Sequence, residues 1–138
     1  MSSDAILSDS QALLAQVLRA LADKKGRDLI VFDMRGHSDL TDYCVLATGL
    51  NGPHLKALAN ELRVRLKGPG RGPVRRSSTP ESGWLVADAV DVVAHVFTPE
   101  MRSYYGLDEL WAKIPRVPVE PLLEPESGAD AAVKPKSD

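Results

Sequence analysis

Asp88 and Asp91 are the residues whose type and spacing come nearest to catalytic chemistry. Paired carboxylates at strand ends can hold the metal ions used in phosphoryl transfer. A spacing of three residues, however, puts two side chains on opposite faces of one strand, and a turn between strands also favours Asp. Neither a third carboxylate nearby nor a Gly-Ser type phosphate loop accompanies them. A turn is therefore preferred, and a metal-dependent nucleotidyltransferase-like enzyme using Asp88 and Asp91 is the alternative.

Other chemistry-bearing residues give weaker signals. Residues 48–52 (TGLNG) precede a predicted helix, where a phosphate could bind, but they match neither GxxxxGK[ST] nor GxGxxG, which favours a plain turn. His37, His54 and His95 lack metal-site spacing, and His95 alternates with apolar neighbours as a core or interface residue does. The single Cys44 lies in an apolar run and is predicted to be reduced and buried. We expect no catalytic residue, metal or cofactor.

Aromatic residues concentrate in residues 84–111, which hold both tryptophans and two of the three tyrosines of a chain only 5% aromatic. Residues 77–114 carry six acids against two basic residues, whereas residues 54–76 carry seven basic residues against one acid. Aromatic groups beside acids are typical of an interface core with a charged rim. Packing of the last helix onto a sheet explains the same residues. The acidic setting suits a basic protein partner better than a phosphate backbone.

Arg71, Arg75 and Arg76 form a basic group that could touch RNA. No aromatic residues are interleaved with them, and the whole chain has a net charge of −2. A solvated loop is the preferred interpretation, and a secondary contact with RNA is left open.

Hydrophobic periodicity predicts the elements that position these residues. A Ser8–Gln11 capping box starts a helix that Gly26 can end, and Asn51 and Thr98 can cap two more helices. Strands are predicted at residues 28–34, 43–48, 74–79, 84–88 and 91–97, the last two as an antiparallel hairpin. The predicted fold class is α/β (α+β), with a mixed sheet of about five strands flanked by helices.

Length and composition bound the organisation of the chain. At 138 residues and 43% hydrophobic content, the chain fits one domain, predicted at residues 8–114 after a flexible stretch at 1–7. The proline-rich residues 115–138 are predicted to be a disordered tail. No apolar run reaches the roughly 18 residues of a membrane span, and the polar start is unlike a signal peptide, so we predict a cytoplasmic protein without membrane contact.

Three segments carry a resemblance to a known family: DYCVLATG (42–49), GWLVADAVDVVAHVF (83–97) and RSYYGLDELW (102–111). From about residue 21 to residue 111 the chain resembles the ribosomal silencing factor family, also called Iojap-related. The resemblance implies a nucleotidyltransferase-like fold without transferase activity. Residues that fall on the family's motif are Trp84, Val86, Asp88, Asp91, His95, Arg102, Tyr105, Leu107, Leu110 and Trp111.

The resemblance also implies a function. A protein of this family is expected to bind a large-subunit ribosomal protein at the intersubunit face and to block joining of the small subunit. The expected partner is basic, ribosomal RNA is a possible secondary contact, and the free chain is either a monomer or a homodimer.

Departures from the family's pattern centre on the hairpin turn. Ala89 and Val90 stand where a large residue and then Gly are usual, and Val does not adopt a positive φ cheaply. The turn geometry is therefore expected to be affected. The remaining departures are Cys44 for an aromatic or large apolar residue, Asn51 for Ser, and Glu81 with Gly83 as a loose form of an acidic–Gly pair.

Overall fold

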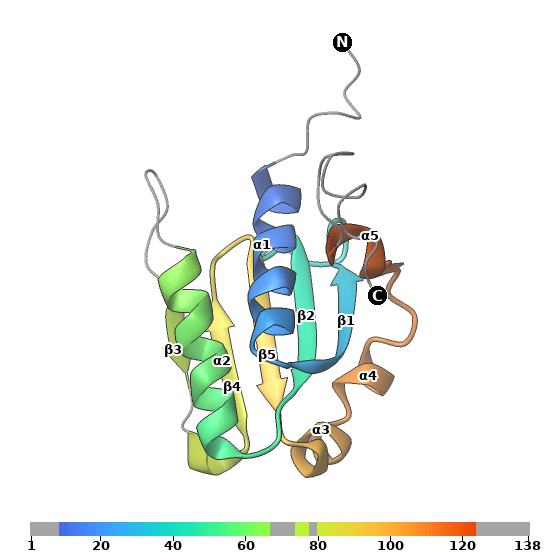
Figure 1. Ribbon diagram of the computed structural model, residues 1–138. Helices are drawn as coiled ribbons and strands as arrows, with labels where there is room; N and C mark the ends of the chain where they lie inside the picture. The colour runs from blue at the N-terminus through green and yellow to red at the C-terminus, as the bar shows by residue number, and fades with distance from the viewer. Residues whose placement is uncertain (1–8, 67–73, 78–79, 124–138) are drawn as a thin grey trace, which may run out of the picture.

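The computed structural model describes residues 9–66, 74–77 and 80–123, which form one mixed sheet with helices on both faces (Figure 1). Its elements in chain order are α1 (Asp9–Asp23), β1 (Arg27–Asp33), β2 (Tyr43–Thr48), α2 (Gly52–Arg65), β3 (Arg75–Ser77), a 3₁₀ turn (Pro80–Ser82), β4 (Trp84–Asp88), β5 (Val92–Phe97), α3 (Pro99–Tyr105), α4 (Leu107–Leu110), β6 (Arg116–Val117) and α5 (Glu120–Leu123). The predicted mixed α/β architecture is confirmed.

The sheet has the strand order β3-β4-β5-β2-β1-β6. β2 and β5 pair in parallel, with Tyr43 opposite Val92, and the other four pairings in the described part of the chain are antiparallel. All five predicted strands are present, and β4 and β5 form the predicted hairpin. β2 lies at the centre and every one of its residues is buried, as expected of a strand covered on both faces.

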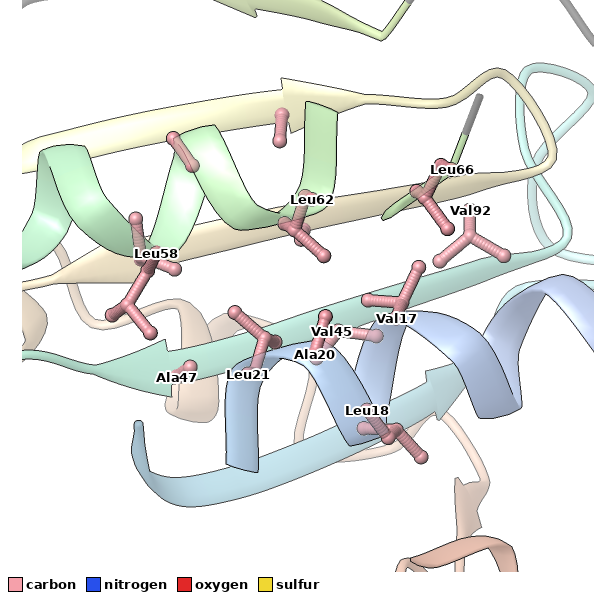
Figure 2. Packing of buried hydrophobic residues seen from close by; sticks show 14 of the residues in the cluster. Val17, Leu18, Ala20, Leu21, Val45, Ala47, Leu58, Leu62, Leu66 and Val92 are labelled. Atoms are coloured by element: carbon pink, nitrogen blue, oxygen red, sulfur yellow. The ribbon is translucent and has the colours of Figure 1, made fainter. Parts of the chain in front are cut away.

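One face of the sheet is covered by α1 and α2 (Figures 1 and 2). Leucines and valines recurring at helical spacing along both helices point inward onto β2 and β5. Figure 2 shows Val17 and Leu21 of α1 and Leu62 of α2 directed toward Val45 and Val92. This first core holds the larger share of the buried hydrophobic residues and fixes the sheet.

The opposite face carries a smaller second core built on Phe32, Cys44, Leu46 and Phe97. Residues from α3, α4 and the segment after them pack against it: Met101, Leu107, Trp111 and Ile114. Two predicted caps are present: Asn51 accepts from the His54 N–H at the start of α2, and Thr98 accepts from the Met101 N–H at the start of α3. The arrangement brings the aromatic helix segment over the strands of the hairpin.

Residues 115–123 correct the predicted boundary of the tail. Val117 of β6 pairs with Val31 of β1, and the Pro115 carbonyl accepts the Asp33 N–H at 2.8 Å. Leu122 and Leu123 of α5 pack against the first core. Proline lacks an N–H but keeps a carbonyl acceptor, so it is tolerated at a sheet edge. The rest of the predicted tail and the predicted flexible stretch at 1–7 lie outside the described residues.

Within the part of the chain that the structure describes, every helix is too short or too polar to cross a bilayer.

Candidate functional site

The β4–β5 hairpin places four predicted site residues on the sheet face opposite α1 and α2. Trp84, Val86 and Asp88 alternate along β4 to this face, and the register sets Val86 opposite His95. All four residues are half-buried, because the α3–α4 segment covers this face only in part.

Trp84 is the centre of an aromatic cluster. Its ring stacks on Phe97 with centroids 5.4 Å apart and meets Tyr105 of α3 at 4.4 Å. Its indole Nε1–H donates to Nδ1 of His95 at 3.2 Å. Tyr104 extends the cluster outward by an edge contact to Tyr105 at 5.1 Å. Aromatic pairs in such offset and edge geometries stabilise beyond the burial of their area.

Trp111 joins the cluster from the other side. Its ring meets His95 at 5.9 Å and packs edge-on against Phe32 at 5.4 Å. Leu107 is half-buried against the second core, so it serves packing. The outward positions belong to Tyr104, Tyr105 and Leu110, which are 76%, 43% and 69% exposed. We use the name aromatic face for Trp84, Val86, Asp88, His95, Tyr104, Tyr105, Leu110 and Trp111.

Tyr104 is the member of the aromatic face missing from the residues that the resemblance supplied. In the sequence, Tyr104 was indicated only by the concentration of aromatic residues in 84–111. Helical periodicity alone could not show which of Tyr104 and Tyr105 is exposed. The two are adjacent at the end of the short helix α3, and both side chains reach the surface.

His95 is held neutral in the aromatic face. Burial lowers its pKa from 6.5 to about 4, although the nearby Asp88 carboxylate acts in the opposite direction. Since Nδ1 accepts the Trp84 N–H, the ring proton of the neutral imidazole lies on Nε2. His95 thus supports Trp84 as a hydrogen-bond acceptor.

Arg102 has an internal role, and its side chain is only 12% exposed. Its Nε and Nη2 donate to both carboxylate oxygens of Asp108 at 3.1 and 3.0 Å, which lowers the Asp108 pKa. Its Nη1 donates to the Asp28 carbonyl at 2.7 Å and to Thr48 Oγ1 at 2.9 Å. The side chain therefore ties α3 and α4 to β1 and β2, and positions the aromatic face.

The backbone conformation of Asp28 makes its carbonyl available to Arg102. It adopts φ +52 inside an irregularity of β1 between Arg27 and Ile30. A bulge leaves a carbonyl outside the regular strand ladder, and here it is satisfied by Arg102. A cavity of about 340 Å³ lies beside this junction, lined by residues that include Arg27, Thr48, Leu50 and Arg102.

The Asp88–Asp91 segment is a turn, as preferred. Asp88 Oδ1 accepts the Val90 N–H at 2.8 Å, and the Asp91 side chain is exposed. Val90 adopts φ +71, so the turn keeps the left-handed conformation that a Gly would have there. Among residues 9–66, 74–77 and 80–123, no group of three or more His, Cys, Asp or Glu side chains could hold a metal ion. The hydrogen bond to the Val90 N–H gives the Asp88 carboxylate a turn-forming role.

Cys44 is buried in the second core, as predicted, and is not in a disulfide. Burial, and secondarily the Asp88 carboxylate, raise its pKa to about 11. Residues 48–52 form the predicted strand-to-helix turn, in which Asn51 caps α2. Of the predicted basic group, Arg75 is exposed on the edge strand β3, while Arg71 and the Arg76 side chain lie outside the described residues.

Comparison with known proteins finds matches to one protein family. The family model described as "Ribosomal silencing factor during starvation" matches residues 7–138. The ribosomal silencing factor of Chromobacterium violaceum is 37% identical over 101 residues, which are 73% of this chain and 83% of the relative. That of Bacillus subtilis is 31% identical over 107 residues, 78% of this chain and 91% of the relative.

Solved structures and a plant relative agree with that match. A crystal structure of a C. violaceum protein superposes with a TM-score of 0.70 at 37% identity, covering 76% of this chain and 88% of that one. A Bacillus halodurans crystal structure superposes with a TM-score of 0.68 at 31% identity, covering 78% and 98%. The mitochondrial Iojap-related protein of Arabidopsis thaliana is 32% identical over 117 residues, 80% of this chain and 63% of the relative.

Proposed function

The chain belongs to the ribosomal silencing factor family, and from that premise we propose that it represses translation by binding the large ribosomal subunit. Its aromatic face docks on a basic large-subunit ribosomal protein at the intersubunit face. The bound protein then occludes the small subunit. This mechanism acts in the cytoplasm and uses no catalytic residue.

The observation that carries the proposal is the exposure of Tyr104, Tyr105 and Leu110 beside an already packed aromatic cluster. Exposed aromatic and leucine side chains that adjoin one another mark interaction surfaces more often than isolated apolar residues do. Rigid aromatic side chains lose little conformational entropy on binding, so they serve as anchors.

Charge supports a basic partner. The segment that carries the aromatic face, residues 81–111, also carries exposed acids, which include Glu81, Asp91, Glu100 and Glu109. Asp108, by contrast, is neutralised by Arg102. Complementary charge at the rim of an interface raises the rate of association and disfavours partners of like charge, such as bare RNA.

Tyr105→Ala and Leu110→Ala test the proposal by co-sedimentation with separated large and small subunits. Truncating an interface anchor costs about 2 kcal/mol, so each variant should bind large subunits about thirtyfold more weakly. These residues are preferable to Trp84, whose three ring contacts also support the fold. Subunit joining, followed by sucrose-gradient sedimentation, should recover in proportion to the lost binding.

Val64→Ala is the matched control. Val64 is a 60% exposed apolar residue on α2, the helix covering the other face of the sheet. Its truncation should leave binding unchanged. Wild-type affinity in folded Tyr105→Ala and Leu110→Ala proteins would refute the assignment of this face, and association with small subunits would refute the mechanism.

A further inference from the structure

The turn between β4 and β5 contains a side chain that the fold itself does not need. Val90 adopts φ +71, an unusual conformation for a β-branched residue. Three hydrogen bonds hold the turn: Val90 N–H to Asp88 Oδ1, Asp91 N–H to the Ala89 carbonyl, and Ala89 N–H to the Val92 carbonyl. None of the three uses the Val90 side chain, and only the first uses its backbone, so a Gly or Asn would form the same turn without the strain.

The Val90 side chain also adds little to the core, because it is 66% exposed. A residue that strains its backbone and leaves its side chain in solvent does not serve stability. Strain of this kind is typically retained where a side chain serves function.

A second exposed apolar residue lies in the neighbouring loop. Leu40, between β1 and β2, is 86% exposed, the largest value among the described large hydrophobic residues. The two loops are joined by hydrogen bonds from the Asp42 and Tyr43 N–H groups to the Asp91 carbonyl, at 2.9 and 3.1 Å. Figure 1 shows both loops at the same end of the sheet, away from α3.

Acidic residues surround this pair and indicate the charge of its occupant. Asp39, Asp42, Asp88 and Asp91 all belong to these two loops or the strand end beside them. Two cations lie near these acids: Arg35 is engaged by Asp33 in a two-pronged pair at 2.9 and 2.8 Å, and Arg75 stands opposite Asp88 in the β3–β4 pairing. An apolar contact with an acidic rim is complementary to a basic protein surface.

The pair is also continuous with the aromatic face. Asp88, the last residue of β4 on that face, bonds the Val90 N–H directly. Asp88 is four residue steps along β4 from Trp84, about 13 Å at the usual rise per residue. One partner of ordinary interface size spans such a distance.

We propose that Leu40 and Val90 form a second apolar contact for the same basic large-subunit protein, at the end of β4 opposite Tyr105. This inference rests on the proposed function and adds a contact to it. Because this contact lies at the other end of β4 from Tyr105, its loss should weaken binding in addition to any loss at Tyr105 or Leu110.

Val90→Gly, Val90→Asn and Leu40→Ser, made in the full chain, test the contact. Binding to isolated large subunits is measured by co-sedimentation, and stability by thermal melting. We expect each variant to bind about fivefold more weakly or worse, since each removes apolar area from the interface. The melting temperature should hold or rise in both Val90 variants, because the strain is relieved, and should hold in Leu40→Ser. Val64→Ser is the exposed-apolar control and should change neither quantity.

The outcomes separate the two proposals. Wild-type binding by the Val90 and Leu40 variants, with Tyr105→Ala still impaired, overturns the second contact and leaves the proposed function standing. Absence of large-subunit binding by the wild-type protein overturns both. Loss of a homodimer in analytical ultracentrifugation, with subunit binding intact, identifies a second copy of the chain as the occupant and overturns the inference.

Discussion

The Trp84 indole N–H donates to Nδ1 of His95 across the β4–β5 hairpin at 3.2 Å. The bond requires an unprotonated Nδ1, so the central hydrogen bond of the aromatic face exists only with neutral imidazole. It joins two residues that sequence analysis had assigned to one site without indicating that they touch.

Stability should therefore depend on pH through His95. The folded protein protonates His95 only near pH 4, whereas the unfolded chain does so near pH 6.5. Between these values the unfolded state binds more protons, so the free energy of unfolding falls as pH falls, by about 3 kcal/mol in all. Urea unfolding of the wild type and of His95→Asn, from pH 7.5 to pH 4, measures this change in the free energy of unfolding. The stability difference between the two should shrink toward pH 4, and a constant difference would contradict the prediction.

Arg102→Met should destabilise the fold far more than Arg35→Met. Removing the Arg102 guanidinium strips hydrogen bonds from Asp108, the Asp28 carbonyl and Thr48, at a cost of about 2–4 kcal/mol. Arg35 also makes a two-pronged carboxylate pair, but its side chain is 51% exposed, so its loss should cost about 1 kcal/mol or less. Equal midpoints in urea unfolding of the two variants would argue against the internal role of Arg102.

Comparing Gly83→Ala with Gly36→Ala separates two causes of lost stability: backbone strain and steric crowding by the added Cβ. Both glycines have positive φ, +78 and +82. A Cβ at Gly83 would lie 2.5 Å from Met101 Cγ, whereas one at Gly36 would meet nothing within 4 Å. We expect a loss of about 1 kcal/mol at Gly36 from strain alone, and about 1–3 kcal/mol more at Gly83. Chemical denaturation gives both values, and similar losses would show that α3 moves away freely.

Cys44 should be unreactive in the folded protein. With its pKa near 11, about one thiol in a thousand is ionised at pH 8, and the sulfur is also buried. Ellman's reagent at pH 8 should label the native protein very slowly and the guanidinium-unfolded protein at once. Rapid labelling without denaturant would mean that the second core opens readily.

Local signals in the chain were enough to place most elements. The caps at Asn51 and Thr98, the alternation in residues 84–88 and the apolar run at 43–48 each depend on neighbours within a few residues, and the structure confirms them. The segment after Pro115 was misjudged, because its order comes from pairing with β1, far away in the chain.

The sequence by itself determined the strands, the caps, the hairpin and the concentration of aromatic residues beside acids, because these follow from residue type and short-range period. Tertiary structure alone decided which aromatic side chains face outward and that Arg102 faces inward. The partners of Arg102 at Asp28 and Thr48 are 74 and 54 residues away, a separation across which no period carries information. It also decided that the loops of Val90 and Leu40 lie at one end of the sheet, since only the parallel pairing of β2 with β5 brings these loops together.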